Sequence, residues 1–145
     1  MLPKKFSKNA LSGLTVVAVD DDPGSLGIVS IVLQHHGAKL FTATNGEQGL
    51  EVICKVHPDL IITDLSMPRM DGWTMMARVK EDPDLAKIPV VALSAHAMSH
   101  QKEDARAKGF TRYITKPLLP STFIQELVNV LQDVPELTAR IQVQG

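Results

Sequence analysis

Five short apolar runs recur along the chain, and each is followed by a segment with helical character. The runs are TVVAV (15–19), KLFTA (39–43), LIIT (60–63), VVALS (90–94) and RYIT (112–115). Most are too continuously apolar to alternate between buried and exposed positions, which is typical of strands covered on both faces of a parallel sheet. Helices are expected over 25–36, 46–56, 73–80, 99–108 and 121–132. This alternation predicts a doubly wound, flavodoxin-like α/β fold, in which right-handed crossovers place helices on both faces of a five-stranded parallel sheet.

Polar residues stand at the ends of four of these runs. Asp20 and Asp21 follow the first run, Asp64 follows the third, Ser94 closes the fourth and Lys116 follows the fifth. In an open parallel sheet, ligands bind beyond the carboxyl ends of the strands, where the strand order reverses. The order 2-1-3-4-5 would bring these four ends together, although the spacing alone does not prove it. Three carboxylates, a hydroxyl and an ammonium at one edge suit a divalent cation and a phosphoryl group.

The length of 145 residues fits one domain, expected over 13–132, between a flexible arm (1–12) and a tail (133–145). A net charge of −1 gives no general attraction to nucleic acid or to anionic membranes, so proteins or small molecules are the expected partners. Cys54 is the only cysteine and is expected to be a small buried hydrophobe. Without an internal disulfide, a signal peptide or a long apolar segment, the chain is predicted to be soluble and cytoplasmic.

Four sequence motifs carry a resemblance to a known family. They are VDDDP (19–23), ITDLSMPRMDGW (62–73), ALSA (92–95) and GFTRYITKP (109–117). In this order and spacing, they resemble the response regulator receiver domain of two-component signalling, over about residues 14–131. The strand order 2-1-3-4-5 is the order known for that family.

The resemblance implies a role for each polar residue at the predicted edge. Asp64 would be the phosphoacceptor. Asp21 and Asp64 would bind Mg²⁺ directly, Asp20 would hold it largely through water, and the backbone carbonyl of Ser66 would be a further ligand. Lys116 would pair with Asp64 at rest and with a phosphoryl oxygen afterwards. An aspartate near its usual pKa is ionised at neutral pH, so this attack on phosphorus would need no general base.

The resemblance also implies a conformational switch. Ser94 would hydrogen-bond the phosphoryl group and Tyr113 would turn inward, which would remodel the face formed by the fourth helix, the fifth strand and the fifth helix. This face would bind a downstream protein or a second copy of the chain. The alternative for Tyr113 is a half-buried strand aromatic with its hydroxyl in water. Ser66 and His96 occupy positions that tune phosphoryl loss, and a cis peptide bond is expected before Pro117.

Each acid also has a simple structural alternative, which is strongest for Asp22, expected to be a helix N-cap. The inward stripe of the first helix is expected to be Ile28, Val29, Val32 and Leu33. Ile31 lies off this stripe and Leu26 at its margin, so both are candidates for docking the phosphodonor.

The function expected is that of a signalling switch, not an enzyme that turns over a separate substrate. The chain would take a phosphoryl group from a histidine kinase or a histidine phosphotransfer protein and signal by binding an unknown downstream protein. Only 14 residues follow Leu131, so direct DNA binding is not expected. One alternative is the receiver segment of a hybrid histidine kinase. A less favoured one is an aspartate-nucleophile phosphatase, because Ser66 stands where such enzymes carry a second acid.

Overall fold

The computed structural model describes residues 11–95, 99–134 and 137. Within this part of the chain, five strands alternate with five helices. Their bounds are β1 Thr15–Val19, α1 Pro23–His35, β2 Lys39–Ala43, α2 Gly46–Val56, β3 Leu60–Asp64, α3 Gly72–Glu81, β4 Val90–Ser94, α4 Ser99–Ala107, β5 Arg112–Thr115 and α5 Pro120–Asp133. The strands form one parallel sheet in the order β2-β1-β3-β4-β5. The predicted fold class and strand order are therefore confirmed.

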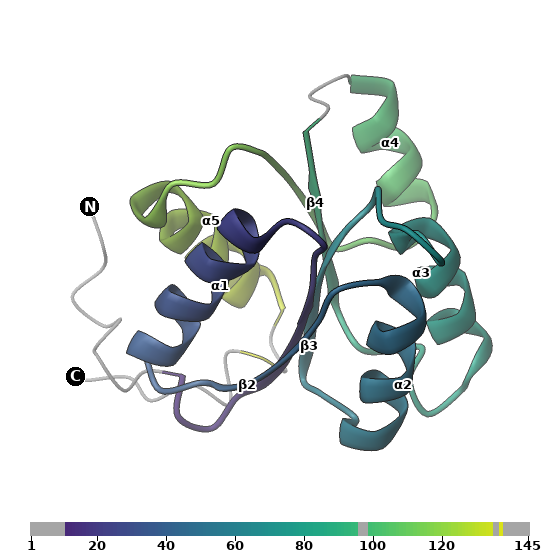
Figure 1. Cartoon of the computed structure of the whole chain (residues 1–145), viewed down its shortest axis with the longest axis horizontal. Helices are drawn as coiled ribbons and strands as arrows, with labels where there is room; N and C mark the ends of the chain where they lie inside the picture. Colours follow the sequence, from purple (N-terminus) through teal and green to yellow (C-terminus); the bar gives the residue numbers. More distant parts are fainter. Residues whose placement is uncertain (1–10, 96–98, 135–136, 138–145) are drawn as a thin grey trace.

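The sheet is the middle of three layers (Figure 1). Helices α1 and α5 cover one face, and α2, α3 and α4 cover the other. Successive residues of a strand point to opposite faces, so Val16 and Ala18 of β1 join the core on one side, and Val17 and Val19 join the core on the other. Strands β3 and β4 are buried along their whole length. This explains why their sequences are continuously apolar.

The helix starts are fixed by polar side chains. Asp22 is the N-cap of α1, where its carboxylate accepts hydrogen bonds from the Gly24 amide at 3.2 Å and from the Ser25 hydroxyl at 2.8 Å. The predicted capping role of Asp22 is thus confirmed. Asn45 and Asp71 cap α2 and α3 in the same way. Each cap follows directly on a strand or loop of the site edge, so these bonds fix where the helices begin relative to that edge.

One burial prediction is wrong, and the core includes two leucines outside the expected domain bounds. Cys54 is exposed, because Ile53 occupies the core-facing position of α2 and the next residue lies about 100° further round the helix. Leu11 and Leu137, which lie in the expected arm and tail, are buried in the core beside α1 and α5. The core therefore includes residues on both sides of the predicted domain bounds.

The predicted inward face of α1 is confirmed, except that Ile28 is only partly buried. Val29, Val32 and Leu33 are buried, Ile28 packs partly against the core, and Ile31 is 69% exposed.

Among the helices in the described residues, none is both long enough and apolar enough to cross a membrane.

Candidate functional site

Three carboxylates converge beyond the carboxyl ends of β1 and β3. These strands are neighbours, with Val19 paired to Thr63, so Asp20, which follows β1, lies beside Asp64, the last residue of β3. One carboxylate oxygen from each of Asp20, Asp21 and Asp64 lies within 4.8 Å of the others. Asp20 and Asp64 are buried, whereas Asp21 is exposed. The cluster therefore has a buried floor and one side open to solvent.

Lys116, which follows β5, reaches across this cluster. Its Nζ lies 3.0 Å from Asp20 Oδ2 and 3.5 Å from Asp64 Oδ2, and it donates a hydrogen bond to Asp20 Oδ1 at 3.2 Å. The expected contact with Asp64 is present, but the contact with Asp20 is closer, which sequence reasoning did not anticipate. The peptide bond between Lys116 and Pro117 is cis, as expected.

Burial and crowding change the protonation of these groups. Burial, followed by the charge of Asp20, raises the pKa of Asp64 to about 6, against the lowering effect of Lys116 and of the Ser66 and Leu65 amides. Burial also raises the pKa of Asp20. Burial alone would lower the pKa of Lys116, but its hydrogen bond to Asp20 and the charges of both acids raise it. Asp64 is therefore not near its usual pKa, but it is still mostly ionised at neutral pH.

The cluster fits a hard divalent cation. Its ligand atoms are carboxylate oxygens, which Mg²⁺ prefers. Asp20 Oδ2 is buried and accepts no hydrogen bond, although the Lys116 ammonium lies beside it. Two buried acids with raised pKa values, held near a third, leave negative charge that one ammonium does not balance. A cation on the solvent side would remove this excess.

The structure describes three of the other predicted site residues. Ser94 is buried at the end of β4, beside β3. Ser66 is exposed in the loop between β3 and α3. Tyr113 is half-buried, and its hydroxyl donates to Gln101 Oε1 of α4 at 3.0 Å, so the hydroxyl is not simply in water. His96 lies outside the described residues.

Comparisons with known proteins identify the family. The model of the response regulator receiver domain matches residues 16–128. The chain belongs to this family. Its fold also matches that of the chemotaxis response regulator CheY4 of Vibrio cholerae, with a TM-score of 0.77 and 31% identity over 81% of this chain and 98% of that one.

Two further relatives show the settings in which similar domains occur. The chain is 34% identical to part of the sensor histidine kinase CheAY of Helicobacter pylori over 77% of its own length, but it spans only 14% of that protein. It is 25% identical to a chain in the CheX–CheY–BeF3–Mg²⁺ complex of Borrelia burgdorferi, with a TM-score of 0.75 and coverage of 81% of this chain and 89% of that one. The chain is thus a receiver domain of two-component signalling.

Proposed function

We propose that this receiver domain takes a phosphoryl group from a phosphohistidine donor onto Asp64, with Mg²⁺ in the acidic cluster, and signals by changing a protein-binding surface. The observation that carries the proposal is the convergence of Asp20, Asp21, Asp64 and Lys116 at one sheet edge. The relative solved with BeF3 and Mg²⁺ supports the same chemistry.

In the proposed transfer, a carboxylate oxygen of Asp64 forms a bond to phosphorus while the bond from phosphorus to the donor imidazole nitrogen breaks. The imidazole keeps the electron pair of that bond and takes up a proton. Because Asp64 is already mostly ionised at neutral pH, no side chain has to remove a proton from it. The chain's task is to hold the carboxylate in line with the bond that breaks and to offset charge on the phosphoryl oxygens.

The named residues divide this task. Asp20, Asp21, Asp64 and the Ser66 carbonyl would hold Mg²⁺, which supplies two positive charges beside the phosphoryl oxygens when bound. Together with Lys116, those charges balance the three carboxylates of the cluster. Lys116 would move its contact from Asp64 to a phosphoryl oxygen, and the Ser94 hydroxyl would donate to another. Ser66 and His96 would tune how long the phosphoryl group stays.

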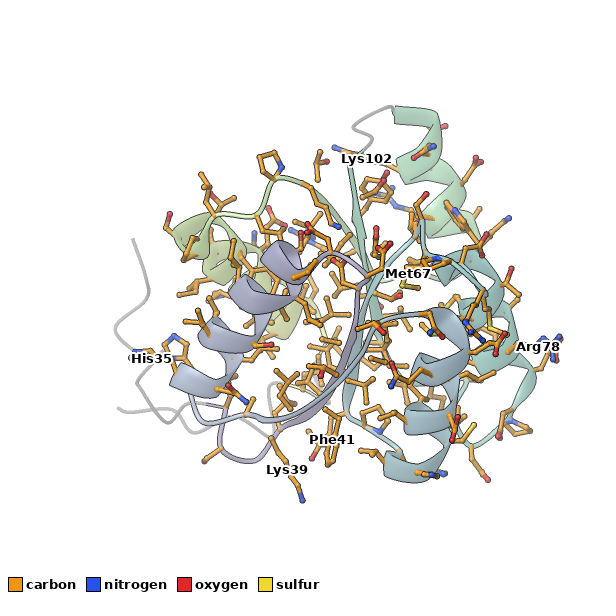
Figure 2. All side chains as sticks on the ribbon, viewed as in Figure 1. His35, Lys39, Phe41, Met67, Arg78 and Lys102 are labelled. Carbon is orange, nitrogen blue, oxygen red and sulfur yellow. The ribbon has the colours of Figure 1, made fainter. Side chains whose placement is uncertain are left out.

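The proposed output surface is the face formed by α4, β5 and α5. A cavity of about 230 Å³ opens there, lined by residues that include Lys102, Arg106, Tyr113 and Glu126. Lys102 lies on the α4 side of this region in Figure 2. An inward turn of Tyr113 would break its bond to Gln101 and reshape the cavity wall. A downstream protein, or a second copy of the chain, would read that change.

Phosphopeptide mapping tests the acceptor assignment. Incubation with acetyl phosphate and Mg²⁺ should place one adduct on Asp64, as read by mass spectrometry, and Asp64→Ala should abolish it. Asp22→Asn is the matched control, because Asp22 is a neighbouring acid outside the cluster and should leave labelling intact. Label that persists in Asp64→Ala would refute the assignment.

A separate assay addresses the phosphatase alternative. An aspartate-nucleophile phosphatase would turn over a small phosphomonoester, whereas the proposed switch should not. The serine at position 66, exposed in the loop after Asp64, offers no carboxylate to protonate a leaving group. Sustained release of phosphate from such a substrate would favour the enzyme.

A further inference from the structure

The loop between β3 and α3 is closed on itself and held against the core. This loop, residues 65–71, carries Ser66, whose carbonyl is a ligand in the proposed function, on which this inference rests. At its base, the Gly72 amide donates to the Leu65 carbonyl at 3.0 Å. Met67, labelled in Figure 2, and Met70 pack against the core on the α2 and α3 side. Because of these contacts, one part of the loop cannot shift far without displacing the rest.

A glycine of α2 packs closely against this loop. Gly46 is the first residue of α2, and its amide donates to the Met70 carbonyl at 2.9 Å. A Cβ at position 46 would lie 2.0 Å from that carbonyl oxygen and 2.7 Å from its carbon. Among the described glycines, those with positive φ are Gly37 and Gly109, so Gly46 is needed for close approach and not for an unusual backbone conformation.

A second glycine holds the other side of the loop. A Cβ on Gly72 would lie 2.2 Å from the backbone oxygen of Asp64 and 3.0 Å from the Leu65 Cα. Position 72 therefore touches the proposed acceptor residue itself, and a substitution there would disturb Asp64 directly. The three atoms nearest to a Cβ on Gly46 all belong to Met70, so a substitution there acts first on the loop and not on Asp64.

We propose that Gly46 is a positioning residue for the cation site: it sets the place of the Ser66 carbonyl by letting α2 pack directly on the backbone of Met70. Side-chain Cβ atoms essentially never approach another atom closer than 3.0 Å, so any side chain at position 46 would move Met70 or α2 by about 1 Å. Because the loop is tied at Leu65 and Gly72, a shift of Met70 must be absorbed within residues 66–71, which include the ligand.

The test compares two alanine substitutions in helices. Gly46→Ala should raise the dissociation constant for Mg²⁺ on the order of tenfold, measured by isothermal titration calorimetry, because outer contacts that orient ligands have effects of this size. Gly27→Ala is the matched control: a Cβ on this α1 glycine would meet no atom within 4 Å, so its Mg²⁺ affinity should be that of the parent protein. Phosphorylation of Gly46→Ala by acetyl phosphate should need more Mg²⁺ but should recover when Mg²⁺ is saturating.

Amide hydrogen exchange in the unsubstituted protein keeps the proposal testable if Gly46→Ala fails to fold. Mg²⁺ should slow exchange of the Gly46 amide, which bonds to the loop, more than exchange of the Gly27 amide. If Gly46→Ala folds and binds Mg²⁺ as Gly27→Ala does, or if Mg²⁺ does not slow Gly46 exchange, the positioning role is wrong. If the parent protein itself binds no Mg²⁺, it is the proposed function that fails.

Discussion

At the scale of single residues, the site depends on buried carboxylates that are costly to ionise. The fold raises the pKa of Asp64 from its ordinary value of 3.8 to about 6, so the folded state holds the Asp64 proton more tightly than the unfolded state does. The stabilisation linked to that proton is fully present below the unfolded pKa and is lost as the pH rises through about 6. Asp20 has a shift in the same direction. Without a cation, ionisation of these acids therefore weakens the fold.

The neutral substitution Asp64→Asn should remove the Asp64 part of this penalty. In metal-free buffer, the gain in unfolding free energy over the parent protein should be about 2 kcal/mol larger near pH 7.5 than near pH 4.5. Urea unfolding at both pH values, with a chelator present, measures this difference. Added Mg²⁺ should reduce the gain in unfolding free energy of Asp64→Asn near pH 7.5, because the cation stabilises only the ionised parent protein. A gain that is equal at both pH values, or larger in acid, would contradict the raised pKa.

A second prediction separates two adjacent acids. Asp21 lies in the acidic cluster, whereas Asp22 caps α1 and is not part of that cluster. Asp21→Asn should weaken Mg²⁺ binding on the order of tenfold or more, by calorimetric titration, because it removes a proposed direct ligand. Asp22→Asn changes the charge by the same amount and keeps the cap, since asparagine caps helices equally well. Equal weakening by the two variants would mean that general charge, not ligation, sets the affinity.

At the scale of the elements, strand ends were predictable and contacts between elements were not. Parallel strands bring their carboxyl ends to one edge, so a run such as LIIT followed by Asp64 could be placed from sequence. The contact between Gly46 and Met70 joins residues far apart in the chain and leaves no periodic signal. Asn45 followed by Gly46 indicates only a helix start. Likewise, a lysine after β5 does not reveal that Asp20 is nearer to it than Asp64.

Helix α1 presents one large exposed hydrophobic residue, Ile31, which supports a role in docking the phosphodonor. Leu26, the other candidate, packs partly against the core, so the docking prediction depends mainly on Ile31. Ile31→Asp should slow transfer from a cognate kinase on the order of tenfold, because it places a charge in an apolar contact. Labelling by acetyl phosphate should not change, because this small donor makes no contact with α1.

The control variant for the docking prediction places the same new charge on a different helix. Cys54→Asp alters an exposed position on α2, which covers the opposite face of the sheet. It should leave kinase transfer unaffected. Rates measured with both donors distinguish the cases: if Ile31→Asp slows kinase and acetyl phosphate labelling together, the substitution has damaged the site, and the docking role is wrong.

At the scale of the whole molecule, the acidic cluster and the buried Leu11 lie toward opposite ends of the strands. The sequence did not indicate that Leu11 belongs to the core. The acidic cluster lies at the carboxyl ends of the strands, whereas Leu11 precedes β1 and therefore lies toward the amino ends. Leu11 is fully buried, its amide donates to the His36 carbonyl at 2.8 Å, and its carbonyl accepts from the Leu14 amide at 2.9 Å. A single leucine after a charged segment has no periodicity, so the expected arm over 1–12 included it.

Leu11→Ala tests how far the cooperative core extends. Truncation of a fully buried leucine removes apolar contacts and leaves a cavity, so the free energy of unfolding should fall by about 2–4 kcal/mol. Leu119→Ala is the matched control, because Leu119 is 58% exposed and its truncation should cost about 0.5 kcal/mol or less. Urea unfolding measures both, and acetyl phosphate labelling of folded Leu11→Ala should match the parent rate, since the cavity lies away from the acidic edge. Equal stability of Leu11→Ala and the parent would mean that the segment before β1 only rests on the core and does not belong to it.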